Sequence, residues 1–276
     1  MPNFGYHFAR AHGRAKREFY RALIRAGALS PLRKRAVDLP FEVYSYSGEE
    51  SLPEQIASIR SFLGYGGRPR KWTVVSDGTH SVRSVEILRA IDSAVRVSSA
   101  GDWLPENVPA KLTSYFASHP TGKQLALTMS LPHDGAALYV DSDVLFFPGA
   151  TELERLEGGT CYLADCRLSA DERLFRAPKE KEQPVNSGVL FLSEKLDWSL
   201  GLQRLLELEG APNFFTNQTV THLTMQAHGA ARFDPRKFVL QLDDQFVYPD
   251  KYAGADIVLR HYVHPVRHKF WTTLRA

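Results

Sequence analysis

The hydrophobic positions of this chain follow two periods, one typical of buried strands and one typical of amphipathic helices. Residues 41–46 and 72–76 are short apolar runs rich in β-branched and aromatic side chains, a pattern that indicates buried strands. Between them, residues 53–63 repeat apolar side chains at helical spacing, at Ile56, Ile59, Phe62 and Leu63. Strand, helix and strand joined by short loops predict a parallel βαβ unit, whose ligands bind beyond the carboxyl ends of the strands.

The rest of the chain continues this alternation. Helices are predicted for residues 81–91, 111–129 with a break near 120–122, 151–156, 196–208 and 214–226. Strands are predicted for residues 95–97, 138–147, 160–165, 189–192 and 257–264. Residues 167–183 are highly charged and poor in strand-forming side chains, which predicts a mobile surface segment or lid. The order of elements predicts an α/β protein with one domain over residues 41–276.

Residues 1–40 differ from the rest of the chain in charge. They hold nine Lys or Arg against two acidic residues, a net charge of +7, which leaves −4 for the remainder because the total is +3. Apolar side chains recur at helical spacing over residues 8–27, which predicts a basic amphipathic helix as an N-terminal extension. Such a helix either contacts an acidic membrane surface or a partner, or lies solvated against the domain, which is the preferred placement. Nucleic acid is not expected, because no aromatic platform accompanies the charge.

Composition is that of an ordinary globular protein. No apolar run reaches the eighteen or so residues of a membrane span, and no secretory signal pattern is present. The expected compartment is the cytoplasm, with the inner membrane face as the alternative that the basic helix suggests. Cys161 and Cys166 have the spacing of neither a disulfide framework nor a zinc knuckle, so they are expected to be reduced.

Two acids interrupt the apolar run of residues 138–147. Asp141 and Asp143 are spaced i, i+2, which in an extended chain directs both carboxylates to one side. Burying paired acids costs free energy unless a metal or a proton compensates their charge. A solvent-facing turn is the ordinary alternative for such a pair, but the flanking Tyr-Val and Leu-Phe-Phe argue against it. The run therefore predicts a cation site.

Polar side chains at other predicted strand ends extend this candidate site. Ser45 and Tyr46 end the first strand, and Asp77 follows the second. An acid there can accept from a nucleobase or a ribose, although Asp-Gly is also a common turn. Lys123 comes near a predicted helix N-terminus, where a cation and backbone amides can hold an anion. A solvated lysine is equally compatible with that position.

Three segments in the second half of the chain add polar residues. The corner Asn-Ser-Gly at 186–188 enters a buried strand, where a glycine lets the backbone approach a ligand or simply makes a turn. Residues 217–218 place an Asn-Gln pair in the first turn of a predicted helix. The last strand leads into His261, His264 and Arg267. A histidine in an apolar strand is ordinarily a core residue, but a cluster of cations with an imidazole indicates a phosphate or a metal.

In their order, these residues resemble the nucleotide-sugar glycosyltransferases of the GT-A fold. The closest resemblance is to the retaining family 8, which includes glycogenin and bacterial galactosyl- and glucosyltransferases. It extends from about residue 41 to 271 and depends on a D-x-D motif at 141–143, N-S-G at 186–188, residues 217–218 in place of D-Q, and 261–267 in place of H-x-x-G-x-x-K. It implies a Rossmann-like mixed sheet flanked by helices.

The resemblance also implies roles for individual residues. Asp141, Asp143 and His261 would coordinate a divalent metal, Mn²⁺ or Mg²⁺, with the imidazole favouring Mn²⁺, and His264 is the alternative third ligand. The donor is implied to be a UDP-sugar. Asp77 would lie near its uracil, Asp141 or Ser142 would bond its ribose, Lys123 would reach the donor, and Arg267 would hold the diphosphate. Asn186 and Gln218 would line the sugar site, with Asp165 as a further acid that could contact the sugar. Ser45 and Tyr46, at the end of the first strand, are also expected to bind the donor.

Three positions depart from the family pattern. Asn217 replaces an acid, which puts in doubt a carboxylate near the anomeric carbon at this position. His264 replaces a glycine, and Arg267 replaces a lysine. The last change preserves the charge, and a guanidinium can bind phosphate in a bidentate way.

The implied reaction is sugar transfer with retention to a glycan, lipid-linked or protein acceptor. The sequence offers no convincing nucleophile for double displacement, so front-face attack is preferred. Two other classes remain open. Residues 141–144 also fit the D-x-D-x start of the D-x-D-x-[TV] motif of haloacid-dehalogenase-type phosphatases, with Asp243 and Asp244 as a distal metal pair. That motif normally begins its domain, however. The other is a non-catalytic protein that binds nucleotide-sugars.

Overall fold

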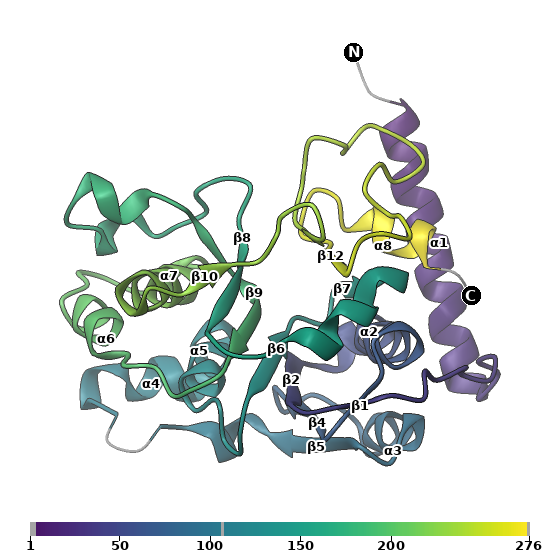
Figure 1. Cartoon of the computed structure of the whole chain (residues 1–276), viewed down its shortest axis with the longest axis horizontal. Coiled ribbons are helices and arrows are strands. Elements are labelled where there is room, and N and C mark those ends of the chain that lie inside the picture. Colours follow the sequence, from purple (N-terminus) through teal and green to yellow (C-terminus); the bar gives the residue numbers. More distant parts are fainter. Residues whose placement is uncertain (1–3, 106–107, 275–276) are drawn as a thin grey trace.

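The computed structural model describes residues 4–105 and 108–274 (Figure 1). Its central sheet contains β2 (Glu42–Ser47), β4 (Trp72–Ser76), β5 (Val95–Ser99), β6 (Ala137–Val140), β8 (Cys161–Ala164), β9 (Val185–Leu192) and β10 (Ala231–Arg232). The seven strands lie in the order β10-β8-β9-β6-β2-β4-β5. Strands β6, β2, β4 and β5 are parallel, whereas β9 is antiparallel to both β6 and β8. The predicted mixed α/β sheet is confirmed.

The strand order creates a topological switch beside β2. The chain moves outward from β2 to β4 and β5 on one side and then returns to β6 on the other. In open α/β sheets, ligands bind at such a switch, beyond the carboxyl ends of the strands. Because Ser47 ends β2 and Asp141 directly follows β6, the sheet itself places the acid pair at this position.

Helices cover both faces of the sheet and divide the interior into two cores. They are α2 (Leu52–Tyr65), α3 (Val82–Ile91), α4 (Ala110–Ser118), α5 (Pro120–Met129), α6 (Ser199–Leu206) and α7 (Thr216–His228). Val43 of β2 packs in the core on the side of α2 and α3, whereas Tyr44 packs in the core on the side of α4 to α7. Leu138 and Tyr139 of β6 divide in the same way. This alternation is the period of two that a strand imposes on its side chains.

A small second sheet brings the end of the chain to the acid pair. It consists of β7 (Val144–Phe146), β11 (Phe238–Val239) and β12 (Leu259–His261), and β12 pairs antiparallel with β7. The register sets His261 opposite Val144, the residue that follows Asp143. A further two-residue pair, β1 (Asp38–Leu39) with β3 (Arg68–Pro69), lies at the start of the domain.

The predicted N-terminal helix is α1 (Phe4–Ala26), which runs past α8 (His268–Thr273) at one edge of the molecule (Figure 1). Two of the apolar side chains whose spacing predicted this helix are not on its buried face: Phe8 and Phe19 are 73% and 64% exposed. The buried face contains Ala9, Gly13, Tyr20 and Ile24. The helix therefore lies against the domain and still exposes an aromatic face.

Two contacts explain which face of α1 is buried. A Cβ atom on Gly13 would lie 2.6 Å from the backbone oxygen of His268, so only glycine permits this approach of α1 to α8. Tyr20 packs on Trp271 with ring centroids 5.4 Å apart. The boundary predicted at residue 40 stays a prediction, and residues 1–3 and 275–276 lie outside the described ranges.

Two segments differ from expectation. The helix predicted at 151–156 is a 3₁₀ helix, η3 (Pro148–Arg155), and residues 167–183 contain two more, η4 (Glu172–Leu174) and η5 (Pro178–Lys181). The prediction that 167–183 form a mobile surface segment is wrong for its centre, where Asp171 is 1% exposed and accepts a hydrogen bond from Thr216 Oγ1 at 2.7 Å. Asp171 attaches the segment to α7, and Glu180 attaches it to Arg204 of α6.

Among the described residues, no helix combines the length and the apolar character that crossing a membrane requires.

Candidate active site

Asp141, Asp143 and His261 converge beyond the carboxyl end of β6. The Nε2 atom of His261 lies 3.1 Å from Asp143 Oδ1 and 3.5 Å from Asp141 Oδ2. Each residue offers one ligand atom, and these three atoms lie within 4.8 Å of one another. Two carboxylates and an imidazole suit a divalent cation such as Mn²⁺. His264 is exposed and outside this cluster, so the structure selects His261 as the third candidate ligand.

The two carboxylates are in different electrostatic surroundings. Burial raises the pKa of Asp141 to about 6, although the charge of His261 opposes this rise. Burial also acts on Asp143, which is 5% exposed, but the charges of Arg267 and His261 outweigh it and hold the pKa of Asp143 below its ordinary value. Neighbouring acids commonly have pKa values that differ in this way, one raised and one lowered. Asp143 is the acid that stays ionised more readily.

A chain of hydrogen bonds orients His261. The Oδ1 atom of Asn186 accepts from Gly188 N at 3.0 Å and faces His261 Nδ1 at 3.0 Å. The Nδ2 atom of Asn186 donates to Gln218 Oε1 at 3.2 Å, and Gln218 Nε2 donates to Asp165 Oδ2 at 3.1 Å. Because the orientation of Asn186 is fixed in this way, His261 Nδ1 donates to it and Nε2 is directed at the carboxylates. Metal-binding histidines are commonly held by such a partner.

Sequence reasoning missed a second chain, which holds Asp141. Its Oδ1 atom accepts from Tyr139 Oη at 2.7 Å and from Gln124 Nε2 at 2.9 Å. Gln124 Oε1 in turn accepts from Asn217 Nδ2 at 3.0 Å. Tyr139 was detectable, because it lies two residues before Asp141 in the same apolar run. Gln124 carried no such signal, because only the packing of α5 near α7 brings it here.

Gly188 lies directly behind the cluster. A Cβ atom there would be 2.2 Å from His261 Cε1 and 2.7 Å from Asp141 Oδ2, so any larger residue must displace one of them. We expect Gly188→Ala to weaken Mn²⁺ binding by about tenfold or more, as loss of ligand orientation does, in calorimetric titration. Gly254→Ala is the matched control, since its Cβ meets nothing within 4 Å. Equal Mn²⁺ affinities for the two variants would contradict this prediction.

Of the polar residues predicted near the site at the strand ends and at Lys123, one points away from it and the others do not. Ser45 is fully buried, and its Oγ accepts from Trp72 Nε1 at 3.0 Å, so its predicted contact with a ligand is wrong. Ser45 points to the opposite face of β2 from Tyr46, whose buried hydroxyl has no hydrogen-bond partner in the described chain. Lys123 and Asp77 do come together, since Lys123 Nζ donates to the Asp77 carbonyl oxygen at 3.1 Å. Contacts of Tyr46, Asp77 and Lys123 with a donor stay predictions.

Arg267 and Ser142 lie on the outer side of the acid pair. The guanidinium of Arg267 donates to Asp143 Oδ2, which places a cation against the candidate metal site. Ser142, Asp143 and Arg267 line a cavity of about 370 Å³ with residues of α1 and the start of α2. A ligand at the acid pair would therefore meet Arg267.

The phosphatase alternative required Asp243 and Asp244 as a distal metal pair. Asp244 instead lies fully buried between Arg260 and Lys269, at 2.8 Å and 2.6 Å. Asp243 is on the surface and pairs with Lys251. That metal pair is not formed, and this interpretation of the sequence is wrong because Asp244 belongs to a buried structural ion cluster and Asp243 to a surface ion pair.

Comparison with solved structures identifies the fold. No family model matches the chain, and no curated protein matches its sequence. A galactosyltransferase, LgtC, solved with donor and acceptor sugar analogs, superposes with a TM-score of 0.56 at 12% identity over 86% of this chain and 97% of that one. Mouse xyloside xylosyltransferase 1 superposes with a TM-score of 0.52 at 12% identity, over 83% of this chain and 99% of that one. The glycosyltransferase GlyE of Streptococcus pneumoniae superposes with a TM-score of 0.53 at 13% identity, over 86% of this chain and 61% of that one. The chain has the GT-A fold of glycosyltransferases, as predicted.

Proposed function

We propose that this chain is a metal-dependent glycosyltransferase that moves a sugar from a UDP-linked donor to a glycan, lipid-linked or protein acceptor. We further propose retention of configuration, as in family 8. The observation that carries this proposal is the convergence of Asp141, Asp143 and His261 at the switch point of a GT-A sheet. Oxygen ligands with one imidazole favour Mn²⁺, with Mg²⁺ as the alternative.

The chemistry requires positive charge beside the leaving group. Cleaving a sugar from a nucleoside diphosphate develops negative charge on the diphosphate, and fixed charges that stabilise it lower the barrier. A divalent ion held by the acid pair and His261 would supply such charge. Arg267 adds a guanidinium on the same side, and its planar fork matches phosphate oxygens. The chain thereby concentrates cations where the diphosphate would leave.

The residues around the expected sugar position favour front-face attack. Asp165 already accepts from Gln218, and residue 217 is an amide that holds Gln124. Neither presents a free carboxylate to the anomeric carbon. We infer that Asn186 and Gln218 orient the sugar through their amides, and that the leaving diphosphate assists the incoming acceptor.

Calorimetry with UDP-, GDP- and CMP-sugars, each with and without Mn²⁺, tests the proposal. We expect a UDP-sugar to bind only with the metal and to be slowly hydrolysed when no acceptor is present. Binding without hydrolysis or transfer to any acceptor would favour the non-catalytic alternative. Absence of binding to all the sugars, or binding that a chelator does not affect, would reject the proposal.

We also propose that α1 contacts an acidic membrane surface from the cytoplasmic side. Its exposed aromatic side chains, Phe4, Phe8 and Phe19 at 79%, 73% and 64%, lie on a helix rich in Lys and Arg, the combination of interfacial helices. We expect Phe8→Ser to reduce sedimentation with phosphatidylserine vesicles by about tenfold, because it removes a full aromatic side chain from the contact. Phe214→Ser, equally exposed but distant in the chain, is the control. Equal sedimentation of both variants would contradict the contact.

A further inference from the structure

The cavity beside the acid pair is lined on one side by α1, which the GT-A sheet does not require. Arg10 and Arg14 of α1 border it, together with Ser142, His264 and Arg267. We propose that Arg10 and Arg14 form, with Arg267, a clamp that binds a phosphate group next to the candidate metal site. For nucleotide ligands this inference rests on the proposed function, and it assigns a ligand-binding role to the N-terminal extension.

The position of α1 is fixed independently of these two arginines. Arg17 donates to Glu54 Oε2 at 3.0 Å, and Glu54 is buried and also accepts from Trp271 Nε1 at 3.2 Å. The close approach of Gly13 to His268 adds a second attachment. Arg10 and Arg14 lie one turn or less from Gly13 on the same helix, so the contacts that seat α1 also carry both arginines to the cavity.

The charges at the cavity are not balanced by the protein. Arg17 is compensated by Glu54, and Arg267 by Asp143. Within residues 4–105 and 108–274, neither Arg10 nor Arg14 forms an ion pair. Arg10 lies over the ring of Tyr6, at 5.4 Å from its centroid, and its positive charge also acts on His268. Glu50 is the remaining acid in the lining. The lining therefore holds four arginines against three acids, and an anion beside Arg10 and Arg14 would offset this excess of positive charge.

A phosphate is the anion that this arrangement fits best. Guanidinium groups form paired, charge-assisted hydrogen bonds with phosphate oxygens. A metal ion bound to Asp143 would compete with Arg267 for that carboxylate and leave the guanidinium available to the same phosphate. The phosphate belongs either to the diphosphate of the donor or to an acceptor that carries a phosphate group.

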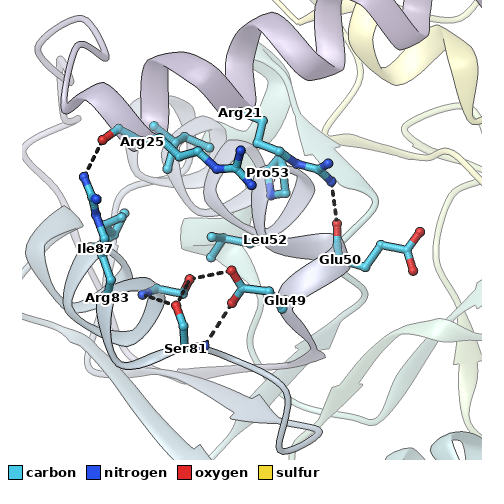
Figure 2. Close-up of a pocket in the computed structure, with 11 residues that line it drawn as sticks. Arg21, Arg25, Glu49, Glu50, Leu52, Pro53, Ser81, Arg83 and Ile87 are labelled. Atoms are coloured by element: carbon cyan, nitrogen blue, oxygen red, sulfur yellow. Dashed lines mark hydrogen bonds between the residues drawn. The ribbon is translucent and has the colours of Figure 1, made fainter.

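A second cavity, of about 470 Å³, lies farther along α1 and has a different character (Figure 2). There the carboxylate of Glu49 accepts from Ser81 N at 3.0 Å and from Ser84 Oγ at 2.9 Å. Arg83 donates to the backbone oxygen of Arg25. Most of its polar groups are thus bound by the protein itself, so it offers less to an anion than the cavity at Arg10 and Arg14.

The test compares Arg14→Gln with Lys16→Gln in the full chain. Both replacements remove one exposed cation from α1, but Lys16 is about 200° farther round the helix and points away from the cavity. Calorimetry with pyrophosphate, without metal, is expected to show about tenfold weaker binding for Arg14→Gln, the loss of one charge-assisted contact, and wild-type binding for Lys16→Gln. Thermal unfolding should be the same for both variants, because neither side chain is buried.

Two further probes identify the source of the phosphate. If the clamp holds the donor, Arg14→Gln weakens UDP binding in Mn²⁺ by a similar factor, and inorganic phosphate does not bind to the UDP-saturated protein. If it holds the acceptor, inorganic phosphate binds to the UDP-saturated wild type and Arg14→Gln weakens that binding alone. Either result supports the clamp. Equal affinities of Arg14→Gln and Lys16→Gln for all three probes overturn it.

Failure of the clamp and failure of the proposed function give different results. Pyrophosphate binding that depends on Arg14, without binding of any nucleotide-sugar, would keep the clamp and reject the glycosyltransferase. Metal-dependent binding of a nucleotide-sugar with no dependence on Arg14 would reject the clamp alone.

Discussion

Asp143→Asn is expected to weaken metal-dependent binding of the nucleotide-sugar by about 100-fold or more and to reduce turnover at least as much. Asp143 is central to the site: its Oδ1 faces His261 Nε2 at 3.1 Å, and its Oδ2 accepts from Arg267. An asparagine keeps the size of the side chain but removes the charge and turns an amide NH₂ toward one of these groups. Asp141 and His261 remain, but one carboxylate offers a divalent ion less negative charge and fewer oxygen ligands than two.

Asp256→Asn is the matched control, because it removes the same charge at an exposed position. It should leave the affinity for Mn²⁺ and for the donor unchanged, and thermal unfolding without metal would show whether either variant loses its fold. If Asp143→Asn kept the wild-type affinity for both ligands while remaining folded, the proposed metal site would be wrong.

Asp244→Asn is expected to lower the free energy of unfolding by roughly 3–5 kcal/mol, the usual cost of removing one partner from a buried ion cluster. Asp244 accepts from Arg260 Nη2 at 2.8 Å, from Arg260 Nη1 at 3.0 Å and from Lys269 Nζ at 2.6 Å. All three side chains are fully buried. Without the carboxylate charge, Lys269 loses its only ion pair among the described residues. Arg260 keeps one of its two ion pairs there, the one with Asp250.

Urea unfolding with linear extrapolation measures this effect. The neighbouring Asp243→Asn is the control, because Asp243 pairs with Lys251 at the surface, and such pairs contribute about 0–1 kcal/mol. Equal losses in the two variants would show that the buried cluster does not stabilise the C-terminal segment. That segment carries both α8 and Arg267, so its stability also bears on the candidate site.

Much of the fold could be predicted because its signals are local. The strand at residues 72–76 is β4 as predicted, and Ser81 caps α3 at the position where the helix pattern begins. The acid pair was evident because two charges inside an apolar run conflict with burial. Ser45 was misplaced for the same local reason: a hydroxyl near a strand end gives no sign of which face of the strand it occupies, and here it faces Trp72.

The N-terminal helix shows where pattern reasoning fails. Its periodicity correctly predicted a helix, but Phe8 and Phe19 are exposed and Gly13 is buried. The buried face was selected by close approach to α8 and by the Arg17–Glu54 pair. Both depend on segments far away in the sequence.

The sequence by itself determined the elements, the alternation of core side chains and the presence of two acids that need compensation, because these follow from spacing along one segment. The family resemblance named His261 and Arg267 as their partners, but only the tertiary structure brings these residues to the acids. His261 is 118 residues from Asp143, and Gln124 meets Asn217 across 93 residues. Those contacts depend on the pairing of β12 with β7 and on the strand order around β2, and no local pattern encodes which distant segments pair. The acid pair was therefore predictable, whereas the site that it belongs to was assembled by the fold.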